Sequence, residues 1–110
     1  MFIFYDGDNI GERFERLYLA NDLATLKLLS TTMIDIHAEI DGICRLMEGP
    51  RVIEAGGDEG LIECERSLAD LLIINIRNVW DGYGMGATVG VGETPRDAYL
   101  AVSKMKKLES

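Results

Sequence analysis

Hydrophobic and polar positions follow two different periods along the chain. The apolar run Phe2 to Tyr5 ends at Asp6-Gly7-Asp8-Asn9, a pattern typical of a short buried strand that is followed by a turn. From Ile10 to about Met47 the period becomes helical, with a break expected near Asn21-Asp22. Apolar residues then recur at alternating steps of three and four, at Leu26, Leu29, Met33, Ile36, Ile40, Ile43 and Met47. This seam indicates a helix that packs either on a sheet or against a second copy of the chain, and His37 beside it is expected to be half-buried and hydrogen-bonded.

The second half of the chain predicts a hairpin and one more crossover. Gly49-Pro50 ends the long helix, and two short strands are expected on either side of the turn sequence Gly56-Gly57-Asp58-Glu59-Gly60. The remaining expected elements are a helix over Ser67 to Trp80, a strand over Ala87 to Val91, and a helix that begins at Thr94-Pro95 and ends near Leu108.

The predicted order of elements is β-α-α-β-β-α-β-α. This order favours an α+β fold of the ferredoxin-like kind, with an antiparallel sheet of about four strands and helices packed mainly on one face. The length of 110 residues suits one domain over residues 1–110.

Charge narrows the range of partners. The chain has 19 acidic and 11 basic side chains, so its net charge is 11 − 19 = −8, which disfavours binding of long nucleic acids and of anionic membranes. The start of the chain does not resemble a signal peptide, and no apolar run approaches the ~20 residues that cross a bilayer. Cys44 and Cys64 have no CxxC spacing, so a reduced, cytoplasmic location is expected. An acidic protein can still bind phosphates where metal ions mediate the contact.

Two acidic clusters stand at the ends of expected strands. Asp6 and Asp8 follow the first strand, and Asp58 and Glu59 lie at the hairpin tip. In a ferredoxin-like sheet the first strand is central and pairs with the hairpin, so the four carboxylates are expected to meet at one edge. Carboxylates brought together repel each other unless a cation lies between them. Hard Mg²⁺ or Mn²⁺ ions suit such ligands, and a pair of them supports in-line phosphoryl transfer.

Glycines and a helix start lie beside these acids. Gly57 is expected to allow the hairpin turn, while Gly7 and Gly11 are expected to leave room for a bulky ligand. Asn9, Ile10 and Gly11 open the first long helix, and the unpaired N–H groups of a helix N-terminus bind phosphate.

Other interpretations of the two acidic motifs are weaker. Each motif alone could be an ordinary hairpin turn or helix cap. A calcium loop would match Asp6, Asp8 and Gly11, but Ile10 and Leu17 stand where such a loop needs oxygen ligands. A D-x-D phosphatase with Asp6 as nucleophile would need a later acidic residue at the position of Ile62.

The segment Phe4 to Gly11 together with Gly56-Gly57-Asp58-Glu59 resembles the palm domain of GGDEF nucleotidyl cyclases and of the large subunit of type III CRISPR complexes. A palm that occupies the whole chain is similar to the minimal CRISPR polymerase family, mCpol. The resemblance implies that Asp6 and Asp58 hold two divalent ions, that the Gly7 carbonyl adds a ligand, and that Glu59 assists. It also implies a nucleotide site that includes Gly57 and Asp8, the backbone of residues 9–11 and the final-helix lysines Lys104 and Lys107.

The resemblance departs from the GGDEF pattern where guanine is read. Phe14 and Glu15 stand at the positions of the guanine-binding Asn-Asp pair. Phe14 could lie against a base but cannot make that polar contact, so ATP is the expected substrate. Gly60 in place of the final Phe of the motif is typical of the CRISPR-like branch.

The implied activity joins nucleoside triphosphates into a cyclic oligonucleotide, expected to be a cyclic dinucleotide, with release of pyrophosphate. One palm offers one triphosphate site, so a homodimer is expected. The family resemblance further implies antiphage signalling through a separately encoded effector that binds the cyclic product. The competing hypothesis is a catalytically silent palm that binds nucleotide or a partner.

Overall fold

The computed structural model describes residues 1–109. Its elements follow the predicted order: β1 (Phe2–Gly7), α1 (Ile10–Leu19), α2 (Leu23–Met47), β2 (Arg51–Gly56), β3 (Glu59–Glu63), the short 3₁₀ helix η1 (Arg66–Leu68), α3 (Ala69–Gly82), β4 (Ala87–Gly92) and α4 (Pro95–Glu109). The expected break between the first two helices is present, since Asn21 has φ 55° and Asp22 caps α2 by accepting a hydrogen bond from the Thr25 N–H.

The four strands form one antiparallel sheet in the order β2-β3-β1-β4. β1 is an inner strand and pairs with β3 of the hairpin, as the sequence predicts. The register sets Tyr5 opposite Gly60 and Asp6 opposite Glu59. The hairpin turn consists of Gly57 and Asp58, and Gly57 has the positive φ of 56° that this turn requires.

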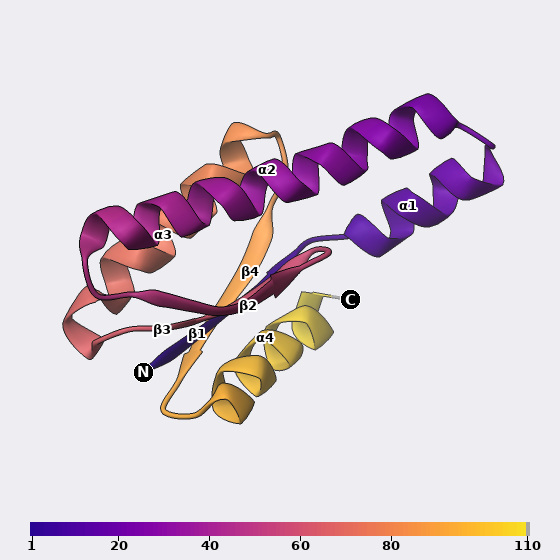
Figure 1. Cartoon of the computed structure of the whole chain (residues 1–110). Helices are drawn as coiled ribbons and strands as arrows, with labels where there is room; N and C mark the ends of the chain where they lie inside the picture. The colour runs from indigo at the N-terminus through magenta and orange to yellow at the C-terminus, as the bar shows by residue number, and fades with distance from the viewer. Residues whose placement is uncertain (110) are drawn as a thin grey trace.

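Helices cover both faces of the sheet (Figure 1). Side chains of β1 alternate between the two faces. Ile3 and Tyr5 join the main core under α2 and α3, whereas Phe4 packs with Ala98 and Val102 of α4 on the opposite face. The α+β, ferredoxin-like class is confirmed, with two helices on one face. α4 covers the other face because the apolar side chains of β1 point both ways.

The apolar seam of α2 is used inside the protein. Leu29, Met33, Ile36 and Ile40 are buried in the main core with Leu72, Ile76 and Trp80 of α3, among other residues. The helix-on-sheet interpretation of the seam is therefore confirmed, and these side chains are not available as a dimer face. Cys44 and Cys64 are free and buried, and both pack in the main core as small apolar residues. Across residues 1–109, no helix has the length and hydropathy needed to cross a membrane.

Candidate functional site

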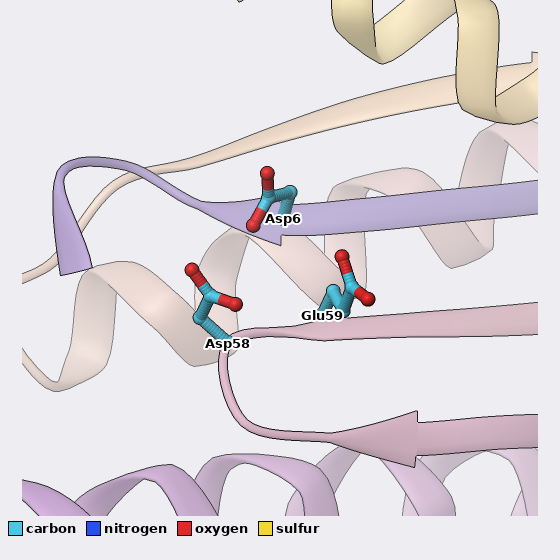
Figure 2. A group of neighbouring side chains, drawn as sticks. All are labelled: Asp6, Asp58 and Glu59. Atoms are coloured by element: carbon cyan, nitrogen blue, oxygen red, sulfur yellow. The ribbon is translucent and has the colours of Figure 1, made fainter. Parts of the chain in front are cut away.

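Three carboxylates meet at one end of the sheet. Asp6 lies near the end of β1, Asp58 in the hairpin turn, and Glu59 at the start of β3 (Figure 2). One oxygen of each lies within 4.8 Å of the oxygens of the other two. The Gly7 N–H donates to the Asp58 carbonyl at 2.8 Å, which ties the hairpin tip to the end of β1. The pairing of β1 with β3 therefore brings together acids that lie about fifty residues apart in sequence.

The electrostatics of this cluster favour a bound cation. Burial raises the pKa of Asp6, the Lys106 ammonium opposes this shift, and the charge of Asp58 raises it further. Burial also raises the pKa of Glu59, with smaller contributions from Asp6 and Asp58. Oδ1 of Asp6 is buried and has no hydrogen-bond partner among the described residues. An orphaned carboxylate oxygen beside two further carboxylates fits a hard divalent ion such as Mg²⁺ or Mn²⁺.

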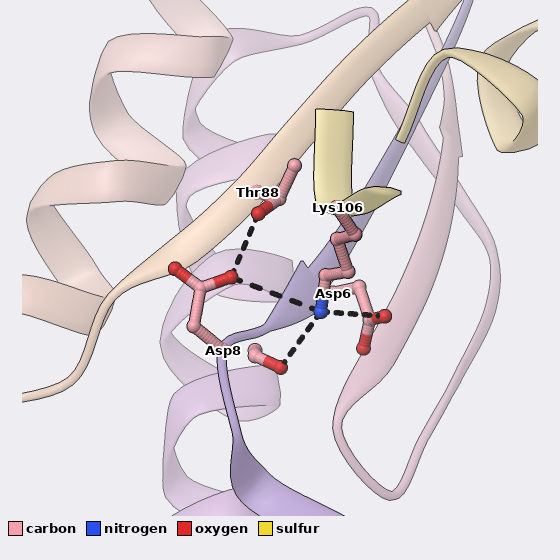
Figure 3. A network of polar contacts seen from close by, with 5 residues as sticks. Asp6, Asp8, Thr88 and Lys106 are labelled. Carbon is pink, nitrogen blue, oxygen red and sulfur yellow. Dashed lines mark hydrogen bonds and ion pairs between the residues drawn. The ribbon is translucent and has the colours of Figure 1, made fainter. Parts of the chain in front are cut away.

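Lys106 of α4 reaches this cluster from the face of the sheet that α4 covers, the face on which Phe4 also lies (Figure 3). Its Nζ lies 2.9 Å from Oδ2 of Asp6 and 3.7 Å from Oδ1 of Asp8, and it donates to the Gly7 carbonyl at 3.1 Å. The ammonium therefore contacts two of the four groups that the family resemblance assigns to the metal ions.

The family resemblance implies Lys104 and Lys107 as the lysines of the nucleotide site and does not point to Lys106. Lys104 is exposed on α4, as is Lys107. A helical signal could have identified Lys106, since it lies four residues after Val102 and eight after Ala98, both of which face the sheet. The structure therefore brings Lys106, and not Lys104, to the carboxylates.

Asp8 stands apart from the three clustered acids. Its Oδ1 accepts a hydrogen bond from the Thr88 hydroxyl at 2.7 Å, and its N–H donates to the Gly86 carbonyl at 3.0 Å. These two contacts hold Asp8 against β4. Of the four acids expected to meet, the structure clusters Asp6, Asp58 and Glu59, whereas Asp8 contacts this cluster through the Lys106 ammonium.

The start of α1 lies beside Gly7 and has an open backbone. Asn9 is the N-cap with φ 59°, and among residues 1–109 its side chain makes no capping hydrogen bond. A Cβ at Gly11 would meet no atom within 4 Å in the described part of the chain, so this backbone faces open space. Ile10 is buried and anchors the turn. The sequence predicts that Gly7 leaves room for a ligand, but the space beside Gly7 is filled by Trp80. A Cβ at Gly7 would lie 2.6 Å from the Trp80 ring, so the packing of Trp80 already requires glycine.

A cavity of about 330 Å³ adjoins the hairpin turn between α1 and α2. Its lining includes the ring of half-buried Phe14, the apolar side chains of Met33 and Ile34, the polar side chains of Ser30 and His37, and the backbone of residues 55–57. Mainly apolar walls with a few polar groups are typical of small-molecule binding sites.

The four-stranded antiparallel sheet, its strand order and the acids at the ends of β1 and β3 define a palm-type α+β protein. The chain belongs to the mCpol family, the minimal CRISPR polymerase domain, whose family model matches residues 2–110.

Solved structures of type III CRISPR components share this fold. A Csm1-Csm4 cassette in complex with one ATP has a TM-score of 0.75 at 20% identity over 97% of this chain. A Csm1-Csm4 cassette in complex with cA4 has a TM-score of 0.69 at 21% identity over 98%. This chain spans 19% of the chain that it matches in each case. No curated protein matches the chain.

Proposed function

We propose that this protein is a metal-dependent nucleotidyltransferase that joins ATP into a cyclic oligoadenylate, expected to be a cyclic dinucleotide. The observation that carries the proposal is the cluster of Asp6, Asp58 and Glu59 beside the open N-terminus of α1. The related folds solved with ATP and with cA4 support an adenine nucleotide as substrate.

In this proposal a 3′ or 2′ hydroxyl attacks the α-phosphate of a second nucleotide. A phosphodiester bond forms, the bond between the α- and β-phosphates breaks, and pyrophosphate leaves. Two Mg²⁺ or Mn²⁺ ions, when bound, polarise the hydroxyl and neutralise phosphate charge. Asp6, Asp58 and the Gly7 carbonyl would hold these ions, and Glu59 would assist as a ligand or as the acceptor of the hydroxyl proton.

Neighbouring elements would bind the triphosphate and the base of the nucleotide. The N–H groups of residues 9–11 would bind the triphosphate, since a helix N-terminus carries unpaired donors and a positive dipole. Lys106 would contribute its positive charge to the same phosphates. The cavity beside Phe14 would take the adenine ring, since its lining offers apolar side chains together with a few polar groups.

A single protomer offers one such site, so cyclisation needs a second nucleotide from another palm. A homodimer with facing sites would supply it. The product would act through a separate effector that binds cyclic nucleotides, in antiviral defence.

The deciding experiment is incubation of the protein with ATP and Mg²⁺ or Mn²⁺, followed by mass spectrometry of the nucleotides. We expect a cyclic oligoadenylate and one pyrophosphate per bond formed. Asp58→Ala is expected to abolish the product, while Asp70→Ala, a change of an exposed acid on α3, is expected to retain it. ATP binding without any turnover in the wild-type protein would reject synthesis and favour a silent palm.

A further inference from the structure

His37, which the proposed function does not use, joins α2 to the hairpin turn. Nε2 of His37 lies 2.8 Å from the Gly57 carbonyl oxygen, and Nδ1 lies 2.7 Å from the Tyr5 hydroxyl. A carbonyl oxygen can only accept, so Nε2 carries the proton, and in the neutral ring Nδ1 accepts from the tyrosine. One imidazole therefore connects a helix, the inner strand β1 and the turn.

Both partners of His37 immediately precede acids of the cluster. Tyr5 is followed by Asp6, and Gly57 is followed by Asp58. The turn is held from the other side by the hydrogen bond from the Gly7 N–H to the Asp58 carbonyl. With these two bonds, the carbonyl groups of both turn residues are held, one by α2 and one by β1.

The position of the Tyr5 hydroxyl depends on glycine in the opposite strand. Tyr5 is fully buried, and its ring crosses Gly60, where a Cβ would lie 2.4 Å from the Tyr5 Cζ and hydroxyl oxygen. The ring also packs against Trp80 with centroids 6.4 Å apart. A packed tyrosine presents its hydroxyl to His37 in one fixed place, so the imidazole is oriented before any ligand binds.

We infer that His37 is a positioning residue, which holds the Gly57 carbonyl so that Asp58 and Glu59 stay close to Asp6. The inference rests on the proposed function for its kinetic consequence, but its structural content is the placement of the three carboxylates. Groups that orient metal ligands without touching the metal typically change metal affinity or activity by about 10- to 100-fold when they are removed.

Two substitutions separate the two hydrogen bonds of the ring. The side-chain amide of Gln can reach the position of Nε2, so His37→Gln keeps a donor for the Gly57 carbonyl. Asn reaches only the position of Nδ1, so His37→Asn keeps the Tyr5 contact and loses the turn contact. Ile40→Val deletes one buried methyl group a turn further along α2 and serves as the control for a general loss of packing.

The first readout is the binding of Mn²⁺ to the nucleotide-free protein, measured by calorimetry on folded variants checked by circular dichroism. We expect about tenfold weaker binding in His37→Asn, recovery to within about threefold of wild type in His37→Gln, and no change in Ile40→Val. The second readout is ATP turnover, where kcat is expected to fall about tenfold in His37→Asn with a smaller change in KM.

Wild-type Mn²⁺ affinity in His37→Asn would overturn the inference, as would equal losses in His37→Gln and His37→Asn. If His37→Asn does not fold, Tyr5→Phe replaces it and is expected to weaken Mn²⁺ binding by releasing the imidazole; unchanged binding would then reject the inference. Absence of any cyclic product from the wild type would reject the proposed function alone, because the Mn²⁺ readout does not depend on synthesis.

Discussion

The Lys106 ammonium lies 2.9 Å from Oδ2 of Asp6 and donates a hydrogen bond to the Gly7 carbonyl, although ninety-nine residues separate Lys106 from Gly7. The Lys106 ammonium of α4 thus offsets the negative charge of Asp6, whose carboxylate also lies beside those of Asp58 and Glu59. Its two shortest contacts are with groups proposed to hold metal ions. On that proposal, Lys106 and a divalent ion would compete for the same oxygens.

The first prediction concerns this competition. Lys106→Gln removes the competing charge, so Mn²⁺ binding to the nucleotide-free protein is expected to become severalfold tighter. ATP turnover is expected to fall at least about tenfold, because the positive charge proposed to contact the triphosphate is lost. Calorimetry with Mn²⁺ and mass spectrometry of the product measure the two effects.

Two further lysine variants test whether these effects are specific to Lys106. Lys27→Gln, a change of an exposed lysine on α2, is the control and is expected to match the wild type. Lys104→Gln tests the residue that the family resemblance suggested. A loss of turnover in Lys104→Gln with none in Lys106→Gln would return the triphosphate role to Lys104.

The second prediction concerns stability and pH. The pKa values of Asp6 and Glu59 are raised in the folded protein, so the folded state binds more protons than the unfolded state between the ordinary and the raised pKa values. These two groups therefore stabilise the metal-free fold most at low pH, and this stabilisation is lost as the pH rises through the folded pKa values. Thermal unfolding in the presence of a chelator measures the effect.

Glu59→Gln isolates one of these groups. Without metal at neutral pH, the variant is expected to melt a few degrees higher than the wild type, since it removes a partly buried charge and relieves its repulsion with Asp6 and Asp58. The difference is expected to shrink near about pH 4, where a free carboxyl group is itself half protonated. Glu65→Gln, at an exposed position after β3, should show neither effect; a pH-independent difference for Glu59→Gln would contradict the prediction.

The third prediction concerns the glycine opposite Tyr5. Gly60→Ala places a methyl group against the buried Tyr5 ring, so the free energy of unfolding is expected to fall by about 1–3 kcal/mol. Gly56→Ala is the matched change in the paired strand, where a Cβ would meet no described atom within 4 Å, and it is expected to be tolerated. Urea unfolding measures the free energy of unfolding of both variants. Equal values for Gly60→Ala and Gly56→Ala would contradict the prediction, because they would show that the Tyr5 ring can move aside at little cost.

The fourth prediction concerns the cavity beside α1. Phe14→Ala removes the aromatic wall proposed to contact adenine, and KM for ATP is expected to rise about tenfold with a smaller change in kcat. Tyr18→Ala truncates an aromatic residue one turn later on α1, where the side chain is 70% exposed, and is expected to leave KM unchanged. Steady-state kinetics with ATP distinguish the two variants, and an unchanged KM in Phe14→Ala would place the base elsewhere.

The order of elements and the three clustered acids could be predicted from the sequence because their signals are local. Periods of two and of 3.6 residues identify strands and helices, and Gly57 marks the turn that carries Asp58. Since an inner first strand pairs with the hairpin in this fold, Asp6 and Glu59 could be expected to meet. The register that sets Asp6 opposite Glu59 bears this out.

Only the tertiary structure decided the placement of Asp8, Lys106 and His37. Asp8 lies apart from Asp6 because the Thr88 hydroxyl on β4 donates to its carboxylate and the Gly86 carbonyl accepts from its N–H. Lys104 and Lys106 are the same type of residue on the same helix, and the packing of α4 on β1 is what brings Lys106 to the acids. His37 makes its hydrogen bonds to partners 20 and 32 residues away. Short-range periodicity specifies elements and turns, whereas contacts between side chains on different elements depend on how those elements pack.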